Sequence, residues 1–308
     1  MKIAVVGCGA MGCIYAGLLS EAGHEVWAVD QWVEHIDAIR TYGLRLEGVN
    51  GDRTVPLNAT TTPTDVGPCD LVILATKAMH VAAAAKGVPP LLGEGAHVIS
   101  IQNGLGGPDK AAEALGAAPI VIGVAEGFGA SIRGPGLAHH NGMELIRLGN
   151  RGSPVTPALE DIAGVWRHAG FNVRTFDDID QLVWEKLICN VCYSGTCTIT
   201  ERTVGEAMED PDAWTVASGC ATEAFNVAKA KHIAVDIDDP VAYVRSFGEK
   251  IPNATPSMLL DLLAGRASEI DVINGAIPRE GRGVGVATPY NNVVSALVRA
   301  KERRMGVR

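Results

Sequence analysis

The N-terminal stretch limits the fold more than any other part of the sequence, because it has the pattern of a strand, a glycine turn and a helix. Lys2 to Val6 is a short apolar run of β type, and apolar residues at helical spacing follow Gly12. In a Gly-x-Gly-x-x-Gly turn, the second glycine lets the backbone approach a pyrophosphate, which lies at the positive end of the helix. A plain glycine turn is the alternative. We expect a dinucleotide to bind at Gly7, Cys8, Gly9, Ala10, Met11 and Gly12.

The residue after the second predicted strand bears on the choice of dinucleotide. The strand, His24 to Val29, ends in Asp30, close to where an acidic residue binds the adenosine ribose 2′-hydroxyl. A carboxylate at this position repels the 2′-phosphate of NADP(H), and the next residues are Gln31 and Trp32 rather than arginine. The pattern favours NAD(H). The alternative role of Asp30, which is compatible with the first, is to cap a helix over Val33 to Thr41.

Alternating strands and helices with short loops predict a doubly wound parallel sheet for the first half of the chain. The strands Asp70 to Ala75 and His97 to Ile101 are followed by Lys77 and by Gln102-Asn103, with an alanine-rich helix expected between them to about Leu92. Ligands of such sheets bind beyond the carboxyl ends of the strands. Lys77 and Asn103 are therefore candidates for cofactor binding, with ordinary loop polarity as the alternative.

Further β segments and one more helix complete the predicted first domain. A hairpin-like segment centres on Asn50-Gly51-Asp52. His139 and His140 lie in a glycine-rich β region, where a polar turn is favoured over a catalytic pair. The remaining predicted segments are the hairpin range Gly43 to Asn58, the β region Ile120 to Leu148 with a strand Met143 to Leu148, the helix Pro157 to Ala169 and the strand Asn172 to Phe176.

The second half of the chain has a helical pattern, so we expect a dinucleotide-binding domain over residues 1–177 and a mostly α-helical domain over 178–308. In the run Leu182 to Ser194, Lys186, Asn190 and Ser194 are spaced by four and share one helix face. A lysine in so apolar a run needs water, a carboxylate or a ligand beside it. The later predicted helices are Ala213 to Lys231, Pro240 to Lys250, Ser257 to Ala264, Glu269 to Glu280 and Asn291 to Arg304.

Composition excludes several classes of protein. The net charge of −9 and the pI of about 5.4 argue against a nucleic-acid or anionic membrane surface. No stretch reaches membrane-spanning length, and the N-terminal apolar run is too short for a signal peptide. Seven cysteines without paired spacing favour reduced thiols and a cytoplasmic protein. We expect no metal site, because Cys189, Cys192 and Cys197 have no histidine or carboxylate at ligand spacing.

Several motifs are distributed over nearly the whole chain. They are Gly7-Cys8-Gly9-Ala10-Met11-Gly12, Gln102-Asn103-Gly104, Trp184-Glu185-Lys186-Leu187 with Asn190, Ser257-Met258-Leu259-Leu260-Asp261, Glu269-Ile270-Asp271-Val272-Ile273-Asn274-Gly275, Arg279-Glu280-Gly281 and Thr288-Pro289. Together these motifs resemble those of the ketopantoate reductase (2-dehydropantoate 2-reductase) family. The resemblance implies a Rossmann domain, a helical domain, a substrate cleft between them and reduction of a 2-keto acid.

The resemblance also implies roles for individual residues. Lys186 matches the lysine that delivers the proton, and Glu269 matches a glutamate near that lysine and the substrate. Asn103 would bridge cofactor and substrate, Asn190 would bind the far hydroxyl of the substrate, and Ser257 would bind its carboxylate. The alternatives are a structural lysine, a helix-start acid after Ser268 for Glu269, and a helix cap for Ser257.

Two departures from the family pattern bear on specificity. The reductases commonly have a second asparagine where this chain has Ser194, which reaches less far and offers fewer hydrogen-bonding groups. Ser194 is therefore the substrate contact that puts ketopantoate itself in doubt, more than reduction of a 2-keto acid. Asp30 is the second departure, because the best-known reductases prefer NADPH; NADP(H) is thus the alternative cofactor.

Two other interpretations of the chain stay open. A β-hydroxyacid dehydrogenase also has a Gly-x-Gly-x-Met-Gly turn and a helix lysine followed by asparagine, although the segment Ser257 to Glu280 fits the first family better. A non-enzymatic dinucleotide sensor is the alternative from another class. The expected partner is a small 2-keto or 2-hydroxy acid, in either reaction direction, and a homodimer is left open.

Overall fold

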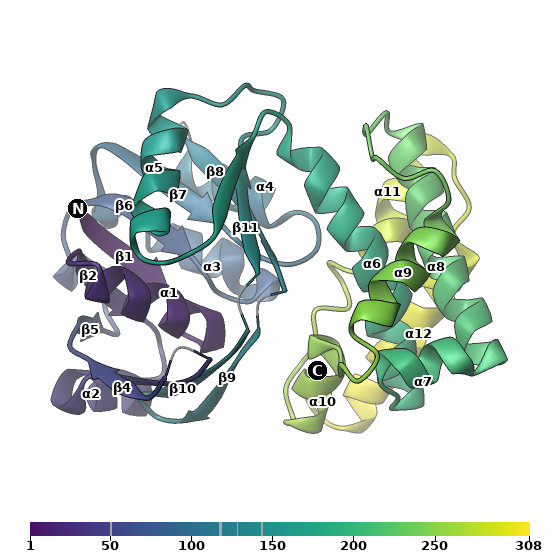
Figure 1. Ribbon diagram of the computed structural model, residues 1–308, viewed down its shortest axis with the longest axis horizontal. Coiled ribbons are helices and arrows are strands. Elements are labelled where there is room, and N and C mark those ends of the chain that lie inside the picture. The colour runs from purple at the N-terminus through teal and green to yellow at the C-terminus, as the bar shows by residue number, and fades with distance from the viewer. Residues whose placement is uncertain (50, 117–118, 128, 143) are drawn as a thin grey trace. The chain divides into compact units, whose positions relative to one another are not determined.

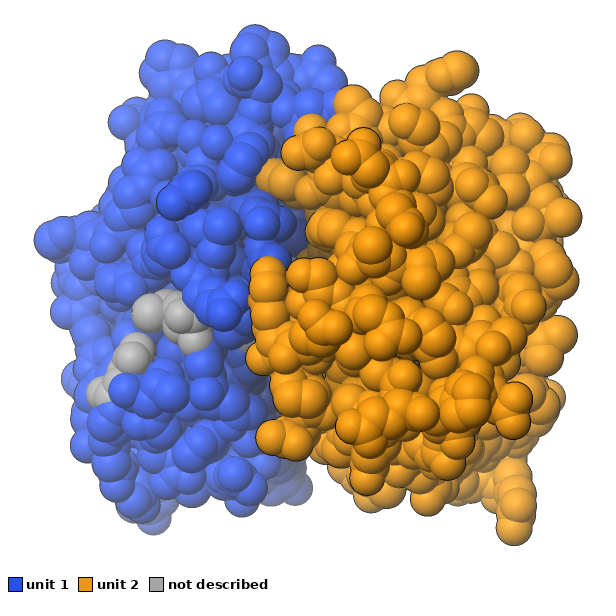
Figure 2. All heavy atoms as spheres, turned by 45° about the vertical axis from the view of Figure 1, so that its right-hand side comes forward, with its two compact units in different colours: residues 1–102, 106–179 blue, residues 103–105, 180–308 orange. Residues whose placement is uncertain are grey.

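The computed structural model describes residues 1–49, 51–116, 119–127, 129–142 and 144–308 (Figure 1). Contacts between Cα atoms divide the chain into two compact units (Figure 2). Unit 1 comprises Met1–Gln102 and Gly106–Ile179, and unit 2 comprises Asn103–Leu105 and Asp180–Arg308. Asn50, at the predicted hairpin turn, and Met143, at the predicted start of a strand, lie outside the described residues.

Unit 1 is built on an eight-stranded sheet in the order β12-β11-β8-β7-β6-β1-β2-β5. Its run β5-β2-β1-β6-β7-β8 is parallel throughout and has the strand order of a doubly wound dinucleotide-binding sheet. The predicted fold class is thus confirmed, but the sheet is not wholly parallel, because β11 runs antiparallel to β8. The strands are β1 Lys2–Val6, β2 Glu25–Val29, β5 Asn58–Thr60, β6 Cys69–Leu74, β7 Leu92–Ser100, β8 Ile120–Glu126, β11 Leu145–Gly149 and β12 Val173–Phe176.

Alternating side chains of the central strands fill a separate core on each face of this sheet. On one face, Ile3 and Val5 belong to the core that includes α1 (Ala10–Glu21) and α5 (Pro157–His168). On the other face, Ala4 and Val6 belong to the core of α3 (Val81–Lys86) and α4 (Gly107–Leu115). Burial on both faces explains why these strands are continuously apolar.

A smaller four-stranded sheet, in the order β4-β3-β10-β9, packs against α1. The predicted hairpin is present, because β3 (Leu44–Gly48) and β4 (Arg53–Val55) pair antiparallel. The predicted polar turn at His139 and His140 is wrong, since both residues lie in β10 (Leu137–Gly142), paired with β9 (Gly129–Gly134) and β3. Burial lowers the pKa of His140, and His139 Nδ1 lies 3.3 Å from Glu47 Oε1.

The predicted alanine-rich helix between β6 and β7 is shorter than expected. It divides into a 3₁₀ turn, Ala78–His80, then α3 and a second 3₁₀ turn, Pro89–Leu91. Proline inside a helix removes a hydrogen bond and clashes with the preceding turn, so the helix ends before Pro89. β7 then begins at Leu92, earlier than predicted.

Unit 2 is helical apart from its loops. Its central helix is α8, which packs against α7, α9, α11 and α12. The predicted helix from Glu269 is wrong at its start, because residues 269–275 form turns in which Gly275 N–H bonds Ile270 O at 2.8 Å. Among the described residues, no helix has the length and apolar character needed to cross a bilayer. The helices are α6 Ile179–Thr200, α7 Val204–Glu209, α8 Pro211–Ala230, α9 Pro240–Lys250, α10 Ser257–Leu263, α11 Ala276–Val284 and α12 Pro289–Arg304, and α2 of unit 1 is Val33–Tyr42.

Candidate active site

The glycine turn after β1 has the geometry that a bound dinucleotide requires. Gly7 has a φ of +92°, and a Cβ there would lie 2.5 Å from the backbone nitrogen of Thr76, in the loop after β6. A Cβ at Gly12 would lie 2.1 Å from Gly7 O, so only glycine lets α1 pack this closely on the turn. A Cβ at Gly9 would meet no atom within 4 Å. The turn is therefore closely packed at Gly7 and Gly12 and open at Gly9, where a pyrophosphate would approach.

The position of this turn in the sheet also fits a dinucleotide. The turn follows β1, and Thr76 follows β6, so the two loops meet where the strand order reverses between β1 and β6. Ligands of doubly wound sheets bind at such a switch point. Gly9 is the N-cap of α1 and has no side chain to cap the helix, so backbone N–H groups at this end can bind an anion.

Asp30 follows β2 and is half-buried. Its Oδ1 accepts a hydrogen bond from Trp32 N at 3.0 Å, a local turn of aspartate onto its own backbone. The helix-cap alternative for Asp30 is wrong, because Trp32 occupies the N-cap position of α2. The proposed contact with a ribose hydroxyl stays a prediction.

Residues at the carboxyl ends of β6 and β7 have different environments. Lys77, after β6, is exposed to solvent. Gln102, after β7, is held by the fold: its Nε2 donates to Leu74 O at 2.5 Å, and its Oε1 accepts from Ser100 Oγ at 2.6 Å. The side chain of Gln102 therefore joins the ends of β6 and β7, a structural role that accounts for its polarity.

Asn103 is the first residue of a short segment that packs within unit 2. Asn103 Oδ1 accepts a hydrogen bond from Lys186 Nζ at 2.8 Å. Leu105 N donates to Val272 O at 2.9 Å, and a Cβ at Gly104 would lie 2.3 Å from the same oxygen. Because Gly104 also has a φ of +77°, the close approach of this segment to Val272 depends on glycine.

The three polar residues on one face of α6, Lys186, Asn190 and Ser194, differ in their exposure to solvent. Lys186 and Asn190 are half-buried, whereas Ser194 is 5% exposed. Beside Ser194, a Cβ at Gly195 would lie 2.3 Å from Val294 of α12 and 2.9 Å from Oδ1 of Asn274 in the turn before α11, so this end of α6 is closely packed within unit 2. The three residues share one helix face, as predicted, but a ligand would reach Lys186 and Asn190 more readily than Ser194.

Glu269 lies in the turn that precedes α11 and is 4% exposed. Val272 N donates to Glu269 O at 3.1 Å, and Val272 O accepts from Leu105. The turn that carries Glu269 is thus joined to the three-residue segment that also contacts Lys186. Both predicted catalytic side chains, Lys186 and Glu269, therefore come from segments that contact Asn103–Leu105.

A buried carboxylate holds this turn in place. Glu302 is fully buried, and its Oε1 accepts from Ser268 N at 2.8 Å and from Ser268 Oγ at 2.6 Å. Arg308 Nη1 donates to the other oxygen of Glu302 at 2.8 Å. Burial raises the pKa of Asp271 less than Arg308 and Arg299 lower it, so the pKa is below its usual value. Tertiary hydrogen bonds at Ser268 explain why the helix does not begin at Glu269.

Replacing Glu302 by alanine is expected to destabilise unit 2. The change leaves two buried donors of Ser268 without an acceptor, and each unsatisfied group costs about 1–3 kcal/mol. Glu302→Gln keeps an oxygen acceptor and should lose less. Urea unfolding followed by circular dichroism measures both variants. Equal stability of wild type and Glu302→Ala would show that this carboxylate does not hold the turn.

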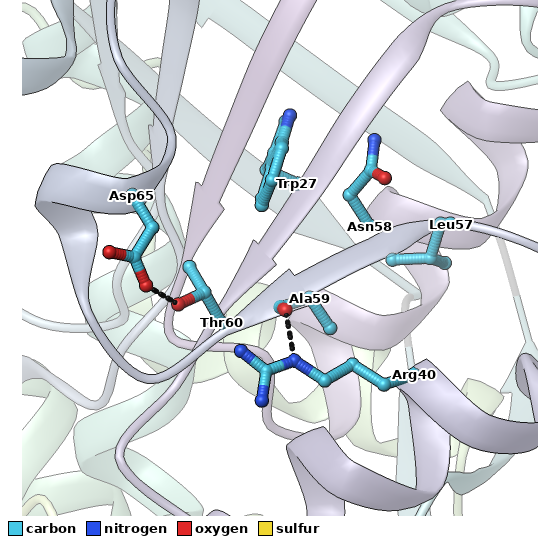
Figure 3. A pocket seen from close by; sticks show the side chains of 7 residues that line it. All are labelled: Trp27, Arg40, Leu57, Asn58, Ala59, Thr60 and Asp65. Carbon is cyan, nitrogen blue, oxygen red and sulfur yellow. Dashed lines mark hydrogen bonds between the residues drawn. The ribbon is translucent and has the colours of Figure 1, made fainter.

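A cavity in unit 1 lies at the β5 edge of the large sheet, and one of its lining residues, Thr60, accepts a hydrogen bond from Asp30 N at 3.3 Å (Figure 3). It has a volume of about 340 Å³. Its polar groups bond one another: Arg40 Nε donates to Ala59 O at 2.8 Å, and Thr60 Oγ1 donates to Asp65 Oδ2 at 2.8 Å. These pairs satisfy the sheet edge, and we assign the cavity no catalytic role.

Comparison with known proteins decides the family. The model for "Ketopantoate reductase PanE/ApbA" matches residues 3–153, and the model for its C-terminal part matches residues 178–302. The 2-dehydropantoate 2-reductase of Lactococcus lactis subsp. lactis is 31% identical over 308 residues, covering 98% of each chain. The chain belongs to the ketopantoate reductase family. It is accordingly an oxidoreductase that acts on a CH–OH group, as the sequence resemblance implies.

Solved structures agree with this family assignment. The ketopantoate reductase from Ralstonia eutropha JMP134 has a TM-score of 0.92 and 33% identity, covering 99% of this chain and 100% of that one. A ternary structure of D-mandelate dehydrogenase with NADH and anilino(oxo)acetate has a TM-score of 0.93 and 31% identity, covering 100% of both chains. The similarity of this family member thus extends to a dehydrogenase of a 2-hydroxy acid.

Ser257 is the remaining residue to which the family pattern gives a role. It is exposed and is the first residue of α10, with Pro256 at the N-cap position. The helix-cap alternative for Ser257 is therefore wrong. Its hydroxyl is available on the surface of unit 2, while binding of a substrate carboxylate stays a prediction.

One side-chain cluster in this family member was not predicted from the sequence. Cys8, Cys13 and His35 lie together in the part of the chain that the structure describes. The signal in the sequence is one cysteine within the glycine turn and one directly after it, whereas His35 comes from α2. Cys192 and Cys197 of α6, by contrast, are ordinary buried thiols. Burial raises the pKa of Cys197 to about 12 and that of Cys192 well above its usual value.

Proposed function

We propose that this chain interconverts a 2-keto acid and its 2-hydroxy acid with a nicotinamide dinucleotide, and that Lys186 is the general acid in the direction of reduction. The observation that carries the proposal is the 2.8 Å hydrogen bond from Lys186 Nζ to Asn103 Oδ1 in a chain of this family. A half-buried lysine directed by an amide is suited to proton delivery, whereas a lysine that merely covers apolar surface would extend into water.

The proposed chemistry divides between the two ends of the reacting bond. A dinucleotide held by Gly7 to Gly12 would supply hydride to the carbonyl carbon. The Lys186 ammonium donates a proton to the developing alkoxide and stabilises its charge, and Asn103 fixes the direction of that ammonium. In the reverse direction, neutral Lys186 accepts the hydroxyl proton. Glu269 then acts through its position near the lysine, as the family pattern implies.

For the cofactor, we propose NAD(H) over NADP(H). The carboxylate of Asp30 directly follows β2, a position at which it can bind a ribose 2′-hydroxyl and repels a 2′-phosphate. The NADH in the structure of D-mandelate dehydrogenase, a protein similar over its whole length, supports the same choice. Lys77 and Asn103 are proposed as further cofactor contacts.

Replacing Asp30 by alanine is expected to raise KM for NADH about tenfold or more, because a hydrogen bond to a charged group is worth about 1.5–3 kcal/mol. The ratio of kcat/KM with NADH to that with NADPH should fall, since the repulsion is also removed. Initial rates with both cofactors measure this. Asp161→Ala, on the exposed side of α5, is the matched control. A wild-type preference for NADPH would refute the assignment of Asp30.

For the substrate, we propose ketopantoate or a related 2-keto acid, bound through Asn190 and Ser257 with Ser194 beyond. A second candidate is the 2-keto acid that corresponds to mandelate. It is favoured by Ser194, which stands where the family commonly has asparagine, and by the similarity to D-mandelate dehydrogenase. An apolar aryl group needs no amide partner, whereas the hydroxyl of ketopantoate does.

The two substrate candidates are separated by their specificity constants. We expect kcat/KM for an aryl or branched 2-keto acid without a far hydroxyl to equal or exceed that for ketopantoate. Ser194→Asn should shift this ratio toward ketopantoate. If ketopantoate is preferred by about a hundredfold in the wild type, Ser194 does not relax specificity and the first candidate stands alone.

A further inference from the structure

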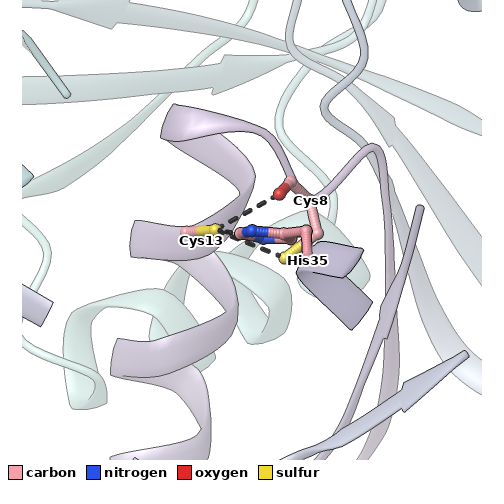
Figure 4. A group of neighbouring side chains, drawn as sticks. All are labelled: Cys8, Cys13 and His35. Atoms are coloured by element: carbon pink, nitrogen blue, oxygen red, sulfur yellow. Dashed lines mark hydrogen bonds between the residues drawn. The ribbon is translucent and has the colours of Figure 1, made fainter. Parts of the chain in front are cut away.

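The side chains of two cysteines meet behind the glycine turn, together with His35 of α2 (Figure 4). Cys8 Sγ lies 3.6 Å from Cys13 Sγ, and Cys13 Sγ lies 3.3 Å from His35 Nε2. All three side chains are buried, with at most 1% of any residue exposed. Cys8 precedes the N-cap of α1 and Cys13 is in its first turns, positions at which an apolar pair often packs. A purely apolar pair, however, would need no hydrogen-bond donor.

The orientation of the His35 ring argues against a metal site. Gly136 N donates to His35 Nδ1 at 3.0 Å, so Nδ1 carries no proton. In the neutral ring the proton is then on Nε2, which faces Cys13 Sγ. A metal-binding histidine instead has a bare nitrogen toward the metal and donates from the other. His35 is thus a hydrogen-bond donor to sulfur.

The hydrogen bonds continue from Cys13 to Cys8. With His35 donating to its sulfur, the Cys13 thiol can donate to Cys8 Sγ or to Cys8 O, which is 3.2 Å away. The hydrogen bond from Cys13 lowers the pKa of Cys8 to about 7, against the effect of burial. Burial instead raises the pKa of Cys220. The thiolate is the nucleophilic form of cysteine. Cys8, with its lowered pKa, is therefore a better nucleophile than a buried cysteine with a raised pKa such as Cys220.

We propose that Cys8 and Cys13 are a modification site at which a hydroperoxide converts the two thiols into a disulfide. With hydrogen peroxide, the Cys8 thiolate attacks one oxygen and the O–O bond breaks. The departing hydroxide takes up the proton that Cys8 released when it ionised, so a sulfenic acid and water form. The Cys13 sulfur then attacks Cys8 Sγ, the S–O bond breaks, and the Cys13 proton leaves with the hydroxyl as a second water. Each sulfur loses one electron and the peroxide gains two.

Formation of this disulfide would change the dinucleotide turn. The sulfur atoms would move from 3.6 Å apart to about 2.05 Å, which draws Cys8 toward α1 between Gly7 and Gly9. Gly9 is exposed, whereas Cys8 behind it is not, so a small oxidant must enter through the turn that a dinucleotide would cover. We expect oxidation to weaken dinucleotide binding and bound dinucleotide to slow oxidation. This consequence rests on the proposed function.

The test treats the reduced full-length chain with hydrogen peroxide, with and without NADH. Peptide mapping by mass spectrometry should find a Cys8–Cys13 cross-link, 2 Da lighter than the dithiol, before other cysteines react. Kd for NADH, measured by fluorescence, should rise about tenfold or more and return to its starting value with dithiothreitol. Cys69→Ser, a buried cysteine of unit 1 outside the cluster, should leave cross-linking unchanged, and Cys13→Ser should abolish it.

Two outcomes would overturn the proposal. The first is reduced Cys8 and Cys13 when other cysteines have been oxidised, and the second is a Cys8–Cys13 disulfide with unchanged Kd for NADH. Mapping of the wild-type chain decides the first even if Cys13→Ser does not fold. Failure of the reduced chain to bind NADH would instead refute the proposed function, while the cross-link could still be read.

Discussion

Replacing Lys186 by methionine is expected to lower kcat for 2-keto acid reduction by about a hundred- to ten-thousandfold, the usual contribution of a positioned general acid. Methionine keeps the apolar part of the side chain but can neither donate a proton nor stabilise an alkoxide. Because the hydrogen bond to Asn103 comes from the ammonium and methionine keeps an apolar stem of similar length, the fold should persist. Kd for NADH should change little. Stopped-flow absorbance at the nicotinamide band measures the hydride-transfer step directly.

The matched control for this variant is Lys250→Met, which changes an exposed lysine at the end of α9 in the same unit. It should retain wild-type kcat. Asn103→Ala, which removes the partner of Lys186, should lower kcat less than Lys186→Met does. A Lys186→Met variant with kcat within about threefold of wild type would refute the general-acid role and favour a dinucleotide sensor.

Alanine substitutions at two glycines of the same turn are expected to change different properties: Gly12→Ala the stability of unit 1, and Gly9→Ala the affinity for NADH. Gly12→Ala places a Cβ 2.1 Å from Gly7 O, so unit 1 should lose about 3 kcal/mol of stability, as overpacked sites do. Gly9→Ala meets no atom within 4 Å and should change stability by less than about 1 kcal/mol. Its Cβ instead occupies the side from which a pyrophosphate approaches, and Kd for NADH should rise about tenfold or more.

Thermal unfolding and NADH titration of both glycine variants separate these effects. The Gly9→Ala variant serves as the folding control for Gly12→Ala, because the two changes add the same methyl group to one turn. If Gly9→Ala binds NADH as tightly as the wild type does, the dinucleotide does not approach at Gly9 and the proposed cofactor site is wrong.

Local patterns in the sequence predicted much of the fold. The glycine turn, the alternation of strands and helices, and the helical second half each depend on short-range spacing. The sheet has the strand order of a doubly wound fold. The stripe of Lys186, Asn190 and Ser194 depends only on helical periodicity. These features were therefore accessible without knowledge of long-range contacts.

The remaining features depend on contacts between distant residues. The helix predicted from Glu269 fails to form there because Ser268 bonds Glu302 on α12. Gln102, at the carboxyl end of β7, is held by hydrogen bonds to Leu74 and Ser100. His35 reaches the two cysteines only because α2 packs beside the glycine turn. Propensity cannot reveal any of these contacts, since tertiary structure overrides it.

The most direct test of the account is a hydride-transfer assay of the purified chain with ketopantoate and a panel of other 2-keto and 2-hydroxy acids, each with both nicotinamide cofactors. We predict that NADH is oxidised in the presence of at least one 2-keto acid, that the product is the 2-hydroxy acid, and that Lys186→Met abolishes most of the rate. A chain that binds NADH yet turns over none of these acids with either cofactor would contradict the account.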